Sequence, residues 1–305
     1  MAFLKLLEGL RFPALNALML GITELGSETA FLVVALVLFW CVDKRKGYYL
    51  MAVGFLGTTV CQFLKILCRV PRPWILDETF TALEQAKPGA SDFSFPSGHT
   101  MNAVGTYGGM ALTTKRKPVR IAAVLLAVLV PFSRMYVGVH TPKDVLTAAV
   151  LALVLIFLLR PVSGDKSGRI LPVLLPCMAV LSMLYLWYLQ YVPMPLEGDT
   201  AFYESALRNA CSLTGAVLGV CLVYPLDTRL VRFREQASLP VQILKAVLGL
   251  ALVLAVKTLL KAPLEAVLPV HPARLVRYFL VVLFAGLGWP ACFPLLRRLE
   301  RKNHS

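Results

Sequence analysis

The sequence is poor in charge. Asp, Glu, Lys and Arg make up only 16% of its 305 residues, whereas a soluble globular protein carries about 25%. Hydrophobic residues account for 58% of the chain instead. Several of them gather in runs of roughly 20 residues, the length that crosses the hydrocarbon core of a bilayer. The composition therefore argues against a soluble domain and indicates an integral membrane protein.

Other patterns are missing as well. The apolar runs lack the alternation of polar and apolar residues that β-barrel strands show, so helices remain as the form in which the backbone crosses lipid. The seven cysteines lie mostly inside apolar runs without the spacing of metal ligands, which favours buried free thiols. These absences predict an all-α fold, a polytopic membrane helical bundle.

Acidic residues are scarce. The chain has 17 Asp and Glu against 31 Lys and Arg, a formal net charge of +14. Such an excess suits nucleic-acid binding only when it forms a basic patch with interleaved aromatic residues. Here the basic residues fall in the short gaps between apolar runs, as in the loops of membrane proteins. We therefore expect no nucleic-acid partner, and we expect the lipid bilayer to surround the chain.

Nine apolar runs are predicted to be transmembrane helices. They cover residues 28–42, 47–68, 97–114, 119–138, 143–160, 170–191, 204–224, 241–260 and 274–296. The residues before them, with Lys5, Glu8 and Arg11 among leucines, form an amphipathic segment that is predicted to lie in the membrane interface. A tenth span there is the alternative.

The chain is predicted to divide into three parts. Residues 1–27 form the interfacial helix, and residues 28–160 form a core with the first five spans. Residues 161–305 form a four-helix membrane extension. The Gly- and Ser-containing segment at 164–168 is the best candidate for a linker between the last two parts.

Basic residues in alternate loops predict the orientation. Examples are DKRK at 43–46, KRKPVR at 115–120 and RRLERK at 297–302. Because cytoplasmic loops carry an excess of Lys and Arg, these loops and the C-terminus are predicted to be cytoplasmic. The opposite loop at 192–200 has no Lys or Arg. Residues 69–96 break this pattern, since this outer loop contains three basic residues, Arg69, Arg72 and Lys87.

Three cations lie at the predicted outer ends of the core spans. Lys65, Arg72 and Arg134 have no matching acid that the sequence places nearby. Cations at one depth repel each other unless an anion joins them, and arginine suits the multidentate hydrogen bonding of phosphate. The sequence therefore predicts an anion site at the outer face.

The span at 97–114 begins at the same face with Ser97 and Gly98. Free backbone N–H groups and the helix dipole make such a start a natural anion site, and glycine lets the anion approach closely. The alternative is that Pro96 and Ser97 only start a helix.

Two of the four histidines, His99 and His140, belong to this group. Two histidines beside three cations favour acid–base or nucleophilic chemistry over a structural role. Asp144 follows His140 by four residues and fits a carboxylate that holds the imidazole tautomer. Thr141 and Asp144 also fit a helix start with an acidic third position, and both roles are compatible. No metal site is expected, because the cations would repel a metal ion.

These residues resemble a known signature. Lys65-x6-Arg72-Pro73, then Pro96-Ser97-Gly98-His99, then Ser133-Arg134-x5-His140-x3-Asp144 is similar to the three-part signature of the type 2 phosphatidic acid phosphatase superfamily, the membrane-bound histidine phosphatases. The resemblance covers roughly residues 28–160. The overall layout is also similar to glucose-6-phosphatase and sphingosine-1-phosphate phosphatase.

The resemblance implies a role for each residue. His140 is expected to be the nucleophile that takes the phosphoryl group, Asp144 to orient it, and His99 to protonate the leaving oxygen. The phosphate is expected to be held by Lys65, Arg72, Ser97, Gly98 and Arg134. No cofactor or metal is implied, and the electrostatic logic is that of phosphoryl transfer.

The predicted function is hydrolysis of a phosphorylated lipid by a metal-independent phosphatase. The lipid is phosphatidate-like, an isoprenoid pyrophosphate or a sphingoid phosphate. The site is expected to be extracytoplasmic, in a bacterial plasma membrane. The alternatives are a phosphatase of a soluble sugar phosphate, a lipid phosphotransferase and, less favoured, an anion transporter, which gives no reason for two histidines and an aspartate at this spacing.

Overall fold

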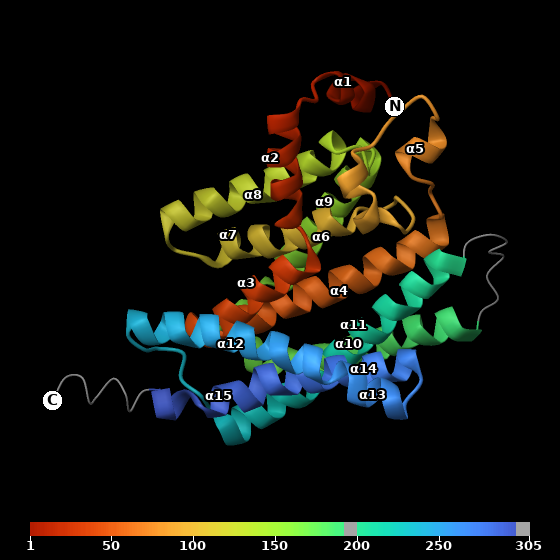
Figure 1. Cartoon of the computed structure of the whole chain (residues 1–305). Helices are drawn as coiled ribbons and strands as arrows, with labels where there is room; N and C mark the ends of the chain where they lie inside the picture. Colours follow the sequence, from red (N-terminus) through yellow and green to blue (C-terminus); the bar gives the residue numbers. More distant parts are fainter. Residues whose placement is uncertain (192–199, 297–305) are drawn as a thin grey trace. The chain divides into compact units, whose positions relative to one another are not determined.

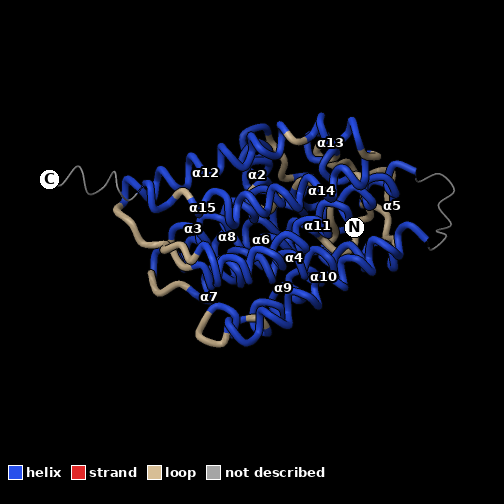
Figure 2. Tube along the Cα trace, turned by 90° about the horizontal axis from the view of Figure 1, so that it is seen from below, coloured by secondary structure: helices blue, strands red, loops and turns tan. Residues whose placement is uncertain are grey.

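The computed structural model describes residues 1–191 and 200–296, and these residues form helices and loops without a strand (Figure 2). They divide into two compact units. The first contains residues 1–34, 49–161 and 200–205, and the second contains residues 35–48, 162–191 and 206–296. The three-part division at residues 27 and 160 stays a prediction. The basic segment at 297–302 and nearly all of the loop at 192–200 lie outside the described residues.

The helices of the first unit are drawn from red to green in Figure 1. In chain order they are α1 (Ala2–Gly9), α2 (Pro13–Glu24), α3 (Glu28–Cys41), α4 (Lys44–Cys68), α5 (Pro73–Leu76), the short turns η1 (Glu84–Ala86) and η2 (Pro88–Ala90), α6 (Gly98–Ala103), the π-helix η3 (Val104–Gly108), α7 (Gly109–Thr113), α8 (Lys117–Tyr136), α9 (Pro142–Leu158) and the turn η4 (Arg160–Ser163). The C-terminal part of α3, the N-terminal turn of α4 and the C-terminal half of η4 belong to the second unit.

The second unit holds most of the remaining helices. They are α10 (Ser167–Tyr191), α11 (Thr200–Leu226), the π-helix η5 (Asp227–Val231), α12 (Leu239–Leu259), α13 (Lys261–Val267), α14 (Val270–Leu283), the π-helix η6 (Phe284–Gly288) and α15 (Trp289–Ala291). Buried polar side chains hold these elements together, because Trp40 Nε1 donates to Ala285 O at 2.8 Å and Trp289 Nε1 to Lys245 O at 3.1 Å.

A helix stands at each of the nine predicted runs, but the count of nine spans is not confirmed. Among the described residues, six helical segments are long and apolar enough to cross a membrane, and the bent pair α2 and α3 makes up to seven. Three predicted spans are short: α3 has 14 residues, α9 has 17, and the helical run α6–η3–α7 extends only from Gly98 to Thr113. About 20 apolar residues are needed to cross the hydrocarbon core.

The N-terminal segment forms two helices instead of the one that was predicted. α1 ends at Gly9 and α2 begins at Pro13, because proline is favoured in a first turn, where its missing N–H costs no hydrogen bond. A 52° bend then separates α2 from α3. Gly26 lies in this bend, and a Cβ atom there would come within 2.9 Å of the carbonyl oxygen of His99.

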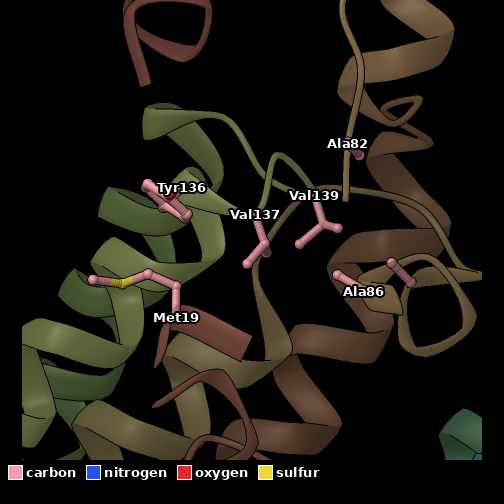
Figure 3. Close-up of a cluster of buried hydrophobic side chains, with 7 residues drawn as sticks. Met19, Ala82, Ala86, Tyr136, Val137 and Val139 are labelled. Carbon is pink, nitrogen blue, oxygen red and sulfur yellow. The ribbon is translucent and has the colours of Figure 1, made fainter. Parts of the chain in front are cut away.

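The core of the first unit surrounds the helix run α6–η3–α7. On one side Met101 and Val104 pack with Cys61 of α4 and with alanines of α9; on another, Ala103 and Tyr107 pack with α8. Small residues at these contacts let the helix backbones approach closely. A third cluster joins α2 to the loop between α8 and α9 and to the loop at 82–90 (Figure 3). Its members are Met19, Ala82, Ala86, Ala90, Tyr136, Val137 and Val139.

Candidate active site

Lys65 and Arg72 stand at the end of α4 and in the segment that leads into α5. Both side chains are buried, and Asp92 joins them. Its Oδ2 lies 3.1 Å from Lys65 Nζ, and its Oδ1 pairs with Arg72 Nη2. Lys65 Nζ also donates to Phe93 O, and Arg72 Nε donates to Asp92 O at 2.7 Å. The loop at 92–93 therefore holds both cations.

The prediction that the three cations lack an acid is wrong for Lys65 and Arg72. Burying a charge is costly unless a partner compensates it, and Asp92 is that partner. Burial raises the pKa of Asp92, but the charges of Lys65 and Arg72 outweigh it and lower this pKa to about 2. Asp92 is therefore ionised at neutral pH and occupies the pair of cations that the signature assigns to phosphate.

Arg134 differs from the other two cations. It lies in the last turn of α8, is buried, and its Nη1 donates to Thr23 Oγ1 at 2.8 Å. Its Nε and Nη2 are also buried and have no hydrogen-bond partner among the described residues. These two nitrogens share one edge of the planar guanidinium, the edge that binds two oxygens of a carboxylate or phosphate. Arg134 thus keeps a bidentate anion-binding edge open.

His140 reaches the site from the loop between α8 and α9. Gly138 allows the turn before it, with a φ of +85° and no room for a Cβ atom against Arg11 and Phe80. Arg72 Nη1 donates to Val139 O at 2.8 Å and lies 3.1 Å from His140 Nε2. Because a guanidinium only donates, Nε2 faces it with a lone pair. A neutral His140 in this position therefore carries its proton on Nδ1.

Asp144 faces the other side of the same imidazole. Its Oδ2 lies 3.6 Å from His140 Nδ1, longer than a hydrogen bond, and accepts from Ser94 Oγ at 2.6 Å. The backbone N–H of Thr141 donates to the same oxygen at 2.8 Å, and Thr141 Oγ1 accepts from the N–H of Asp144. The predicted capping box at the start of α9 is confirmed. The cap fixes the carboxylate, and the carboxylate faces Nδ1.

The charge around His140 decides its protonation. Burial, followed by the positive charges of Arg72, Arg134 and Lys65, lowers the pKa of His140 well below its ordinary value. Without a bound anion, the imidazole is therefore neutral at neutral pH. Only the neutral form has the lone pair that a nucleophile needs.

Ser97, Gly98 and His99 form the start of α6. Ser97 is the N-cap, and its Oγ accepts from the N–H and the hydroxyl of Thr100, so the helix-start interpretation is confirmed. Its own backbone N–H donates to Asp144 O at 3.2 Å, which ties α6 to α9. His99 is half-buried in the first turn, and Arg134 acts on it electrostatically.

The eight predicted site residues all belong to the first compact unit. Direct contacts join Arg72 to His140, His140 to Asp144, and Asp144 to Ser97. Electrostatic interactions join Lys65 and Arg134 to His140. The roles in binding and catalysis stay predictions.

Sequence reasoning missed three residues. Asp92 and Ser94 lie just before the PSGH motif, and their polarity beside a predicted anion site was the available signal. Thr23 is 111 residues from Arg134 in the chain. A hydroxyl on an apolar helix outside the signature gives no signal of such a contact.

Two family profiles match the chain. The first, described as PAP2 superfamily, covers residues 45–167, and the second, described as PAP2 superfamily phosphatase, transmembrane extension, covers residues 211–302. The first match contains every predicted site residue. Neither includes α1, α2 or α3.

Known proteins resemble the chain over about half of its length. It is 35% identical to phosphatidylglycerophosphatase B of Bacillus subtilis, over 50% of this chain and 76% of that protein. It is 32% identical to an undecaprenyl-diphosphatase of Sulfolobus acidocaldarius, over 54% of this chain and 78% of that protein. Sphingosine-1-phosphate phosphatase 2 of Mus musculus is 26% identical, over 60% of this chain and 53% of that protein.

One solved structure aligns with the computed one. It is the crystal structure of a transmembrane PAP2-type phosphatidylglycerolphosphate phosphatase from Bacillus subtilis. The sequence identity is 33% and the TM-score is 0.45, over 55% of this chain and 84% of that chain.

Proposed function

The chain belongs to the PAP2 superfamily, and from this we propose that it is an integral membrane phosphatase that hydrolyses a phosphorylated lipid through a phosphohistidine intermediate. The relatives named above act on phosphatidylglycerophosphate, undecaprenyl diphosphate and sphingosine 1-phosphate, according to their names. All three are phosphorylated lipids. A lipid substrate also suits a site carried by membrane helices.

The arrangement of His140 carries the proposal. Its Nε2 lies 3.1 Å from Arg72 Nη1 and its Nδ1 faces Asp144 at 3.6 Å. The lone pair therefore stands beside a cation that binds phosphate, and a carboxylate stabilises the positive charge that the imidazole gains on attack. Such distances often shorten when the substrate binds.

The first chemical step forms a bond between His140 Nε2 and phosphorus. The bond between phosphorus and the lipid oxygen breaks, and His99 gives this oxygen a proton, which it can hold once the substrate anion offsets the positive charge of Arg134 beside it. Lys65, Arg72 and Arg134 hold the phosphoryl oxygens, together with Ser97 and the backbone of Gly98. Fixed cations of this kind stabilise the charge of the transition state without reorganising.

The second step reverses these roles. His99, now neutral, takes a proton from a water molecule whose oxygen attacks phosphorus. The bond between phosphorus and Nε2 breaks, inorganic phosphate leaves, and His140 returns to its starting state. This sequence needs no metal ion, and the cations supply the positive charge that a metal would bring.

The site is proposed to face the extracytoplasmic side of a bacterial plasma membrane, with the C-terminus in the cytoplasm. Loop charges support this orientation, because basic residues cluster in the loops on the opposite side from the site. The second family profile and the apolar helices support insertion in the membrane.

Phosphate release from purified protein tests the proposal. Phosphatidylglycerophosphate, undecaprenyl diphosphate, sphingosine 1-phosphate and glucose 6-phosphate should be compared without added metal, before and after chelation. We expect release from at least one lipid and a loss of about 10³-fold or more in kcat/KM for His140→Ala. A phosphoryl label that is stable to alkali and lost in acid should form on the native protein and not on this variant.

A histidine of the second unit provides the control. His271→Ala should keep the native kcat/KM, because His271 lies in α14 outside the site. Full turnover by a folded His140→Ala protein would refute the proposed nucleophile. If the enzyme prefers glucose 6-phosphate over every lipid, its substrate is a soluble sugar phosphate and the proposed lipid substrate is wrong.

A further inference from the structure

The N-terminal helix α2 contributes a contact to the candidate site. Thr23 is buried, and its hydroxyl accepts a hydrogen bond from Arg134 Nη1 at 2.8 Å. This is the only hydrogen bond of the Arg134 guanidinium among the described residues. The matched family segment begins at residue 45, so the family assigns no role to Thr23.

Packing fixes α2 against the end of α8. The two helices are in contact (Figure 1), and Met19 of α2 packs with Tyr136 and Val137 in the cluster of Figure 3. Hydrogen bonds add to this packing, since Tyr136 Oη donates to Asn16 Oδ1 at 2.8 Å and Arg11 Nε donates to Tyr136 O at 3.1 Å. Thr23 is therefore held at a fixed place beside Arg134.

The geometry of the guanidinium explains what this contact does. The hydrogen bond at Nη1 restrains the orientation of the guanidinium and leaves Nε and Nη2 open. These two nitrogens are buried without partners, and their parallel N–H bonds match two oxygens of one phosphoryl group. An arginine side chain that must first find this orientation loses rotamer entropy on binding, whereas one already held in place loses less.

We propose that Thr23 is a positioning residue, which orients Arg134 so that its Nε and Nη2 edge faces the phosphoryl group. The inference rests on the proposed function for the identity of the anion. The hydroxyl acts through Arg134 and does not contact the substrate. The N-terminal segment is thereby part of the phosphate site and more than an interfacial anchor.

Paired substitutions separate the hydroxyl from the shape of the side chain. Thr23→Val keeps the volume and removes the acceptor, and Thr23→Ser keeps the acceptor. We expect Thr23→Val to weaken binding of orthovanadate about tenfold and to lower kcat/KM by about the same factor, because loss of a hydrogen bond to a charged group misplaces the cation. Thr23→Ser should restore both values to within about twofold of the native protein.

A matched control tests whether any buried threonine gives this result. Thr59 is also buried, and its hydroxyl donates only to Phe55 O in its own helix, at 2.8 Å. Thr59→Val should leave vanadate binding and kcat/KM unchanged. If Thr59→Val has the same effect as Thr23→Val, the effect belongs to packing and the proposal is wrong.

A double-mutant cycle tests the route through Arg134. Thr23→Val should add little to Arg134→Lys, because the lysine has no guanidinium edge to orient. Additive losses, or native vanadate affinity in Thr23→Val, would overturn the proposal. Calorimetric binding of vanadate needs no turnover, so it tests Thr23 even if no substrate in the panel releases phosphate, which would count against the proposed function alone.

Discussion

The two compact units treat their buried charges differently. In the second unit, Asp227 is fully buried, and Lys44 Nζ lies 3.0 Å from each of its carboxylate oxygens. Tyr48 Oη approaches Oδ2 at 3.5 Å. In the first unit, Arg134 is buried as deeply, yet two of its nitrogens have no partner within the described part of the chain. Arg277 of the second unit is intermediate, since its Nε has no hydrogen-bond partner in the described part of the chain while its Nη1 lies 3.9 Å from Glu265 Oε1.

We propose that this difference separates a structural charge from a functional one. Burying an unpaired charge is costly, so a fold that retains one has a reason outside its own stability. In the proposed function, an anion that binds at Arg134 would supply the missing partner. Lys65 and Arg72 occupy a middle position, because Asp92 already neutralises part of their charge. Substitutions at Arg134 and Asp227 test whether ion pairing distinguishes the two kinds of charge.

Arg134→Gln gives the largest expected effect. We expect kcat/KM to fall by about 10² to 10³-fold, as when one donor to a transition-state oxyanion is removed. The melting temperature should stay the same or rise, because the substitution removes a buried charge that has no ion-pair partner among the described residues. Steady-state kinetics and thermal unfolding in the same detergent check both parts. A large fall in melting temperature would show that Arg134 is structural.

Asp227→Asn should have the opposite effect to Arg134→Gln: it should lower the melting temperature and leave kcat/KM nearly unchanged. It leaves Lys44 without a carboxylate, at an expected cost of about 3 kcal/mol, near the low end for a broken buried pair because Lys44 is partly exposed. The melting temperature should fall by about 6 °C, while kcat/KM below the transition stays within about twofold of the native value. Asp165→Asn is the control: Asp165 pairs with Arg45 at 2.7 Å but is fully exposed, so it should change neither quantity.

Much of the candidate site was predictable from the sequence because its residues lie in short motifs on one stretch of chain. His99, His140 and Asp144 fall in motifs whose helix starts are also readable, and the capping box at Thr141 was confirmed. The partners of the cations were not predicted. The basic residues of the loop at 69–96 dominate its pattern, so Asp92 does not stand out as their partner. Asp92 lies 20 residues beyond Arg72 in that same loop, so only the folded loop shows the pairing.

The positions of the helices were predicted better than which of them are long enough to cross the membrane. Apolar runs identified each of the nine segments, but length in sequence did not separate membrane-crossing helices from shorter ones such as α3. The N-terminal segment shows the same limit. Pro13 signals the start of α2, yet nothing in the sequence indicates that Thr23 meets Arg134, because tertiary contacts between distant helices leave no periodic pattern.

The dependence of stability on pH tests the ion pairs of Asp92 with Lys65 and Arg72. It is the smallest of the expected effects. The pKa of Asp92 is lowered from 3.8 to about 2, so its ionised form is favoured in the folded protein. A carboxylate of this kind stabilises the fold at pH values above its unfolded pKa of about 3.9, and this stabilisation disappears as the pH falls through its folded pKa. The contribution is about 2 kcal/mol. Melting temperatures of the native protein and of Asp92→Asn, measured between pH 6 and 2, should therefore differ most at pH 6 and converge toward pH 2. Parallel curves would show that the Asp92 carboxylate does not stabilise the folded protein through Lys65 and Arg72.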